Sequence, residues 1–167
     1  MRKKLSLLSS RPKIGLSWKR GIGVTNKNYR CIPLKTLKPL FEFDVDFISL
    51  QYHSNARAEL DIFHEQEGHE IITHWQDVID DYDLTAALIT NLDLIISVPQ
   101  SIVHLAGALG VNTIQMCPVK ALWQMGPYGE NAPWYECVQN FWQKTDGDWP
   151  QVVKEVCEGL KMEGYTC

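Results

Sequence analysis

The stretch Asn91-Leu-Asp-Leu-Ile-Ile-Ser-Val-Pro-Gln-Ser-Ile-Val-His-Leu-Ala-Gly-Ala-Leu-Gly110 decides the fold. Residues 94–98 form an apolar run, which is typical of a parallel strand covered on both faces. After a sharp turn, Ser101 is a good N-cap residue, and Gly110 is suited to the position just past a helix end. The stretch therefore predicts a buried strand, a turn and a helix.

A helix in this position has a chemical consequence. It would point its unpaired N–H groups and the positive end of its dipole into the crevice where open α/β sheets bind ligands. This geometry suits a phosphate or a diphosphate. The alternative is one more strand–helix unit of a scaffold, and the stretch alone leaves both readings open.

Composition limits the class of protein. With 167 residues, 45% of them hydrophobic, the chain can form one domain with a substantial core. The net charge of -4 argues against a nucleic-acid binder. Segment 5–8 is too short for the apolar region of a signal peptide, and no segment approaches the roughly 20 apolar residues of a membrane span. Five scattered cysteines without a Cys-x-x-Cys pair fit reduced thiols. We therefore expect a soluble cytoplasmic protein without a metal site.

Strand and helix patterns alternate along the chain. We predict strands at residues 13–18, 45–50, 70–73, 94–98 and 113–117. We predict helices at residues 34–41 after Pro33, 58–64, 84–91 capped by Asp83, 101–110, and from Asp148 to about 161. Alternation at short spacing predicts an α/β fold, a Rossmann-like parallel sheet with helices on both faces. The expected domain is 13–162, with 1–12 as a linker remnant or disordered start and 163–167 as a tail.

Seven motifs carry a resemblance to a known family. They are Lys13-Ile-Gly-Leu-Ser-Trp-Lys19, Arg30-x-Ile-Pro-Leu34, Phe47-Ile-Ser-Leu-Gln51, Asp83-Leu-Thr-Ala-Ala-Leu-Ile-Thr-Asn-Leu-Asp-Leu-Ile-Ile-Ser-Val98, Ser101-x-x-His-Leu-Ala-Gly-Ala-Leu-Gly110, Pro133-Trp-Tyr135 and Gly147-Asp-Trp149. In this order the chain resembles the carboxyl-terminal half of bacterial glycosyltransferases that carry tetratricopeptide repeats. Those enzymes are similar in turn to the ADP-heptose:lipopolysaccharide heptosyltransferases.

The resemblance implies a ligand and a reaction. It implies one half of a GT-B fold, the half that binds a nucleotide-sugar donor, for metal-independent transfer of a sugar to a protein or glycan hydroxyl. No cofactor is expected, because the nucleoside-diphosphate sugar is the substrate. Without a metal, helix N-termini, hydroxyls and cationic side chains must stabilise the departing diphosphate.

Several residues are candidates for donor contacts, each with a structural alternative. Ser101 with the amides of Ile102 and Val103 suits a phosphate, and otherwise Ser101 only caps the helix. Lys19, and less so Arg20, can clamp a diphosphate or remain solvated. The remaining candidates are His104, whose alternative is a packed helical histidine, Gln51, which can reach the base or ribose, and Gln100. Aromatic residues Trp123, Trp134 and Tyr135 can stack on a base, but covering the core is the favoured reading.

Two departures from the family bear on catalysis. The family usually has Asp and then a small hydroxyl residue after the Ser-Val strand end, where this chain has Pro99 and Gln100. Proline offers neither a carboxylate nor an N–H. The chain also shows neither an acceptor domain nor repeats, so we expect no activity by itself. It would then be a fragment of a longer protein or the partner of a separately encoded acceptor or repeat domain. The alternative is a non-catalytic module that binds a nucleotide or a protein.

Overall fold

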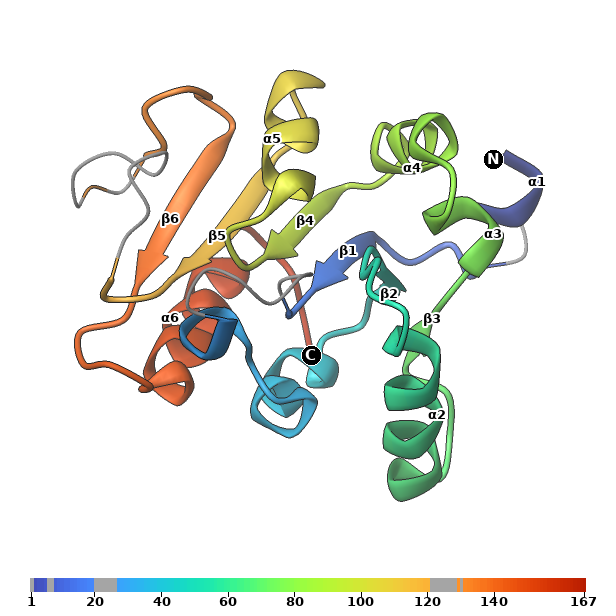
Figure 1. The fold of residues 1–167 in the computed structure, drawn as a ribbon, viewed down its shortest axis with the longest axis horizontal. Coiled ribbons are helices and arrows are strands. Elements are labelled where there is room, and N and C mark those ends of the chain that lie inside the picture. Colours follow the sequence, from blue (N-terminus) through green and yellow to red (C-terminus); the bar gives the residue numbers. More distant parts are fainter. Residues whose placement is uncertain (1, 6–7, 20–26, 121–128, 130) are drawn as a thin grey trace.

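The computed structural model describes residues 2–5, 8–19, 27–120, 129 and 131–167. Six strands form one sheet in the order β3-β2-β1-β4-β5-β6, and every neighbouring pair is parallel (Figure 1). The strands are β1 (Lys13–Ser17), β2 (Asp46–Ser49), β3 (Ile72–Thr73), β4 (Leu94–Ser97), β5 (Thr113–Cys117) and β6 (Val138–Trp142). From β1 the chain first adds β2 and β3 on one side of it, and then adds β4, β5 and β6 on the other side. This is the doubly wound Rossmann order, and the order of the strands reverses between β1 and β4. The predicted fold class is confirmed.

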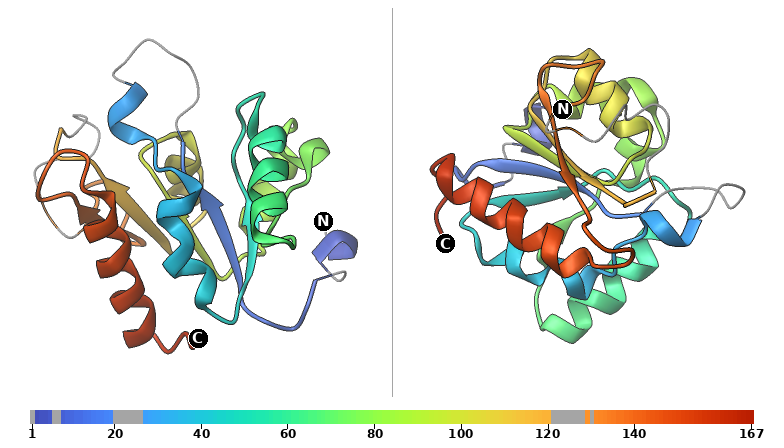
Figure 2. Two further views of the ribbon diagram at one scale, coloured as in Figure 1. Left: turned by 90° about the horizontal axis from the view of Figure 1, so that it is seen from below. Right: turned by 90° about the vertical axis from the view of Figure 1, so that its left-hand side faces the viewer.

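Helices cover both faces of the sheet (Figure 2). One face packs against η2 (Leu34–Glu42), α2 (Ala56–Glu67) and α6 (Trp149–Met162). The other face packs against α1 (Arg2–Leu5), α3 (Gln76–Ile79), α4 (Tyr82–Ile89) and α5 (Ser101–Ala108). The short helix η1 (Lys27–Arg30) lies between β1 and η2 in the chain. We call the two faces the η2 face and the α5 face.

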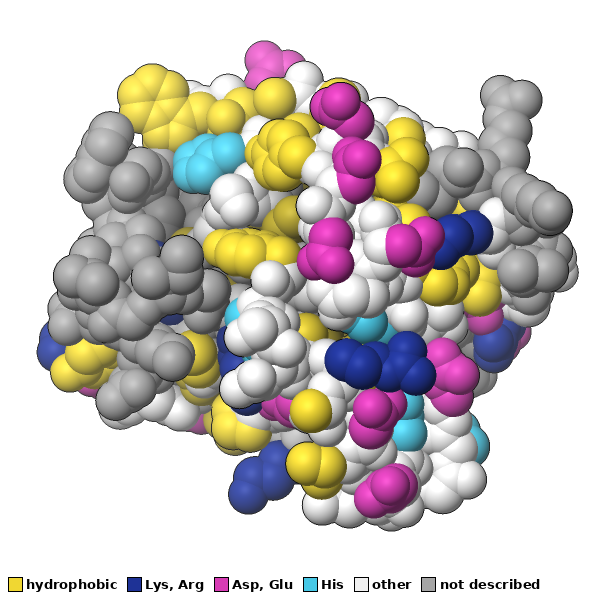
Figure 3. Space-filling view, turned by 45° about the vertical axis from the view of Figure 1, so that its right-hand side comes forward, with side chains coloured by type: hydrophobic (Ala, Val, Ile, Leu, Met, Phe, Trp, Pro, Cys, Tyr) yellow, Lys and Arg dark blue, Asp and Glu magenta, His cyan; other side chains and the backbone are white. Residues whose placement is uncertain are grey.

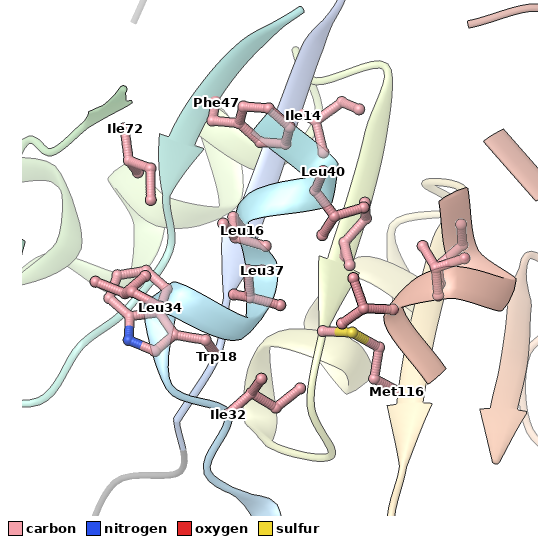
Figure 4. Close-up of a cluster of buried hydrophobic side chains, with 14 of the residues drawn as sticks. Ile14, Leu16, Trp18, Ile32, Leu34, Leu37, Leu40, Phe47, Ile72 and Met116 are labelled. Carbon is pink, nitrogen blue, oxygen red and sulfur yellow. The ribbon is translucent and has the colours of Figure 1, made fainter. Parts of the chain in front are cut away.

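The larger core lies on the η2 face (Figure 4). The predicted helix after Pro33 is present, but it is a 3₁₀ helix. Its buried residues Leu34, Leu37 and Leu40 repeat every three positions. Because a 3₁₀ helix has three residues per turn, this spacing aligns them in one line against the sheet.

The predicted strands are confirmed to within two residues at each end, but one strand was missed. Strand β6 has the sequence Val138-Gln-Asn-Phe-Trp142 and lies at the edge of the sheet. Its polar residues Gln139 and Asn140 interrupt the apolar run that identified the other strands. The sequence pattern therefore gave no strand signal there.

Two predicted helix caps are wrong. Helix α4 begins after Asp81, whose carboxylate accepts a hydrogen bond from the Leu84 amide at 2.9 Å, so Asp83 lies within the first turn. The N-cap residue of α5 is Gln100, and Ser101 is the first helical residue. Asp148 does cap α6, and Gly110 follows α5 with a φ of 72°.

Both ends of the chain contact the sheet and its helices. Leu5 is buried in the core of the α5 face, and the Lys4 ammonium contacts the Asp77 carboxylate at 2.6 Å. In the predicted tail, Tyr165 packs against the η2-face core. No helix within the described ranges has the length and apolar character that a bilayer crossing requires.

Candidate functional site

The candidate site lies where the strand order reverses, between the carboxyl ends of β1 and β4. In an open parallel sheet, ligands bind in the crevice outside the carboxyl ends of the strands at such a reversal. Residues 17–19 leave β1 there, and residues 97–101 connect β4 to the first turn of α5. The sheet topology therefore brings Lys19, Gln100 and Ser101 to the same edge of the sheet, as the sequence predicted.

A row of polar residues crosses the sheet on the α5 face. Strand register pairs Ser17 with Ser97, Ser97 with Gln115, and Gln115 with Asn140. Each of the four is at most 5% exposed. Parallel strands covered on both faces are normally apolar, and burying polar groups is costly unless they are hydrogen-bonded. The row is therefore a feature that packing alone does not require.

Gln100 joins this row to the start of α5. Its side-chain amide donates hydrogen bonds to the Ser17 hydroxyl and, at 3.1 Å, to the Ser97 hydroxyl. The Ser97 hydroxyl in turn donates to the carbonyl of Val98 at 2.8 Å. The buried Oε1 of Gln100 has no partner among the described residues. Gln100 thus holds the helix start against the ends of both strands.

Gln51 is fully buried, and its amide is occupied by protein groups. Its Oε1 accepts hydrogen bonds from the Ser17 hydroxyl and from the amides of Trp18 and Lys19, and its Nε2 donates to the Lys19 carbonyl at 2.7 Å. These bonds fix the chain where it leaves β1. In this geometry, Gln51 acts on the site by positioning Lys19.

The Lys19 side chain points toward α2, which covers the η2 face. Its ammonium contacts the Glu59 carboxylate at 2.5 Å. The other oxygen of that carboxylate lies 3.5 Å from Nε2 of His53. Burial lowers the pKa of His53, while the charge of Glu59 opposes the shift. Arg20 lies outside the described residues.

The first turn of α5 presents the predicted anion contacts only in part. Ser101 is exposed, whereas Ile102 and Val103 are buried. The Val103 amide donates to the Gln100 carbonyl at 3.1 Å. The first N–H groups of a helix have no partner within it, so the amides of Ser101 and Ile102 are the natural anion donors.

A pocket of about 410 Å³ opens beside this turn. It is lined by Leu50, Tyr52, Ile79, Asp80, Tyr82, Thr85, Ser101 and Ile102. Tyr52 and Tyr82 are 37% and 60% exposed, so both rings are accessible to a ligand in the pocket. Neither tyrosine nor Asp80 was predicted as a site residue from the sequence, because they come from separate segments that only the fold brings together.

The surroundings of this pocket are acidic. Figure 3 shows Asp and Glu side chains beside exposed hydrophobic side chains on this side of the molecule. Asp80, Asp81 and Asp83 lie between α3 and α4 or in the first turn of α4, and all three are exposed. Such a field disfavours an anion inside the pocket. The pocket therefore suits a neutral group that donates hydrogen bonds, with any phosphate nearer the helix terminus.

His104 lies on α5 and contacts Tyr135 rather than the pocket lining. Its Nδ1 is 3.4 Å from the tyrosine hydroxyl, and the two rings meet edge to face with centroids 5.9 Å apart. Tyr135 also covers Gly107, where an added Cβ would lie 2.4 Å from the ring. Residue 107 is therefore small because the Tyr135 ring lies against it.

Two aromatic candidates remain, Trp134 and Trp123. Trp134 is 61% exposed, so it does not cover the core, and Trp123 lies outside the described residues.

Cys117 is buried, and burial raises the pKa of its thiol well above the usual value, which makes it a poor nucleophile. Among the described residues, no group of three or more His, Cys, Asp or Glu side chains is placed to hold a metal ion.

The strand order and the crevice define a Rossmann-like domain, and comparisons with known proteins agree. The crystal structure of the glycosyl transferase family 9 protein from Veillonella parvula superposes with a TM-score of 0.62 and 14% identity. The match covers 98% of this chain and 50% of that one. The fold is therefore glycosyltransferase-like and corresponds to half of that enzyme.

Sequence comparison also finds a relative. Protein FlbA of Caulobacter vibrioides is 29% identical over 162 residues, which cover 94% of this chain and 26% of FlbA. The chain thus spans about a quarter of the curated relative and half of the structural neighbour. No family model matches the chain.

Proposed function

We propose that this domain binds a nucleoside-diphosphate sugar as the donor half of a metal-independent GT-B glycosyltransferase. The reaction would transfer the sugar to a protein or glycan hydroxyl, and an acceptor domain or a separately encoded partner would complete the active site. The observation that carries the proposal is the start of α5 at the reversal of the strand order, beside the pocket lined by Ser101 and Ile102.

The parts of the donor divide between two environments. The diphosphate meets the amides of Ser101 and Ile102 and the exposed Ser101 hydroxyl at the positive end of the helix dipole. The nucleoside enters the adjacent pocket, where Tyr52 and Tyr82 offer aromatic faces. Asp80 accepts hydrogen bonds there, which suits ribose hydroxyls or base N–H groups. Lys19 adds a cation from the β1 side.

The structural likeness supports this proposal at the level of the fold. The neighbour is a family 9 glycosyl transferase, and the region matched is half of its chain. The presence of Pro99 in place of the family's usual Asp favours a second candidate, a binding module without catalytic activity. The first candidate binds a nucleotide, and the second binds a nucleotide or a protein, so nucleotide binding is tested first and transfer second.

Isothermal titration calorimetry with UDP, ADP, GDP and their sugars tests the proposal. We expect one nucleotide to bind, and we expect Ser101→Ala and Lys19→Ala each to weaken it several-fold. Matched controls are Ser10→Ala and Lys154→Ala, which alter exposed residues outside the site. Absence of binding by every nucleotide at millimolar concentration would refute a donor site and would leave a protein-interaction module.

A further inference from the structure

The main chain at Lys19 is held on several sides. Gln51 contacts both the amide and the carbonyl of Lys19, at 2.9 Å and 2.7 Å. Lys19 also forms an isolated antiparallel bridge with Cys31. Only the side chain is therefore left to change direction when a ligand binds.

That side chain is engaged by a carboxylate. Lys19 and Glu59 are 2.5 Å apart, and their side chains are 32% and 23% exposed. Glu59 is on α2, which packs on the η2 face, whereas Ser101 and the pocket are on the α5 side. To meet a phosphate held at the start of α5, the ammonium must leave Glu59.

We propose that Glu59 is a built-in competitor that sets the affinity of the site for the diphosphate of its ligand. The proposal rests on the proposed nucleotide-sugar function and goes beyond it by naming a residue that opposes binding. The Glu59 carboxylate offers the Lys19 ammonium an anionic oxygen, as a phosphate of the ligand would. Nε2 of His53 lies 3.5 Å from the second carboxylate oxygen, without a hydrogen bond between them, so Lys19 is the closer partner of Glu59.

The competition favours multiply charged ligands. While Glu59 engages Lys19, the two side chains together carry no net charge. A ligand with a single negative charge gains little by displacing Glu59, since it replaces one carboxylate with a comparable anion. A diphosphate brings more charge and also reaches the helix terminus. The ion pair thus selects a diphosphate over a monoanion.

The test is a mutant cycle measured by calorimetry at about 0.15 M ionic strength, where the Debye length is about 8 Å. The probes are inorganic pyrophosphate and the nucleoside diphosphate that binds the wild-type chain. The variants are Glu59→Gln, Lys19→Ala and the double variant. Glu65→Gln is the matched control, because it removes the same charge from α2 at an exposed position six residues away, about 9 Å along the helix.

We expect Glu59→Gln to tighten the Kd of the diphosphate about fivefold, the factor that corresponds to a partly exposed ion pair. Glu65→Gln should change it by less than about twofold, because exposed charges are screened at this separation. The double variant should bind no more tightly than Lys19→Ala alone. If the glutamine variant does not fold, Glu59→Ala takes its place in the cycle.

Three results would overturn the inference. These are an unchanged or weaker Kd in Glu59→Gln, an equal gain in Glu65→Gln, or a gain that persists without Lys19. With wild-type binding intact, each refutes only the competitor role. If neither the wild type nor any variant binds a diphosphate, the proposed function itself fails.

Discussion

The two faces of the sheet differ in how they use the same strands. On the η2 face, Leu16, Ile96 and Ile114 belong to one continuous apolar core. One residue later along each strand, the α5 face carries Ser17, Ser97 and Gln115. At the carboxyl ends of these strands, the alternation of side chains thus separates the larger apolar core from a face that keeps polar groups beside the candidate site.

The largest expected effect tests the stabilising role of the η2 face. Leu37→Ala removes a fully buried side chain from the 3₁₀ helix and should lower the free energy of unfolding by about 2–5 kcal/mol. Leu109→Ala is the control, because Leu109 is 40% exposed and should cost about 0.5 kcal/mol or less. Urea unfolding followed by circular dichroism measures both. Equal costs would contradict the assignment of the main core to this face.

A smaller loss of stability is expected on the α5 face, where one substitution should also weaken ligand binding. Ser97→Ala removes a hydroxyl that accepts from Gln100 and donates to the Val98 carbonyl. We expect a loss of about 1–3 kcal/mol in the free energy of unfolding, because the buried partners lose hydrogen bonds. We also expect weaker binding of the nucleoside diphosphate, because the start of α5 is no longer held.

Thr113→Val is the matched control for this prediction. The Thr113 hydroxyl also donates to a carbonyl, that of Val111 at 2.9 Å, but from the amino end of β5. We expect the control to cost stability without changing the Kd for the ligand. If both variants weaken binding equally, the polar row has no special connection to the site.

The smallest effect concerns pH and again involves the η2 face. Nε2 of His64 on α2 accepts a hydrogen bond from the Ile72 amide at 3.2 Å, which requires a neutral ring. Burial lowers the pKa of His64 below the ordinary histidine value of about 6.5. The stability that it contributes is therefore present above pH 6.5 and is lost as pH falls through the lower folded-state pKa.

Unfolding free energies at pH 7.5 and pH 5.5 measure this effect. The wild type should be less stable at pH 5.5, and His64→Gln should narrow the difference between the two values. Some difference should remain, because burial also lowers the pKa of His53. A difference that His64→Gln leaves unchanged would show that the α2–β3 contact does not sense pH.

Sequence reasoning predicted the elements whose signals are local. Strands β1, β2, β4 and β5 are apolar runs, and Asp148 and Gly110 mark helix ends with their own side chain or backbone. The cap of α5 was misassigned because Ser101 is the better capping residue by type, whereas Gln100 is held by contacts with β1 and β4. The contact with Ser17 on β1 joins residues 83 positions apart.

The candidate site was predicted in part for the same reason. The strand–turn–helix pattern placed Ser101 at the carboxyl edge of the sheet, and the sheet topology agrees. The pocket residues Tyr52, Asp80 and Tyr82 carry no motif, and the engagement of Lys19 by Glu59 links positions 40 residues apart. Such pairings depend on the tertiary arrangement, which periodicity does not encode.

The contact between Gly107 and Tyr135 constrains how this protein can change over evolutionary time. A methyl group at position 107 would overlap the tyrosine ring, so the two positions cannot drift independently. We expect homologous chains with alanine or a larger residue at 107 to carry a smaller residue at 135. Covariation between these two columns would then serve as a marker for chains that retain this docking of the 133–135 loop on α5.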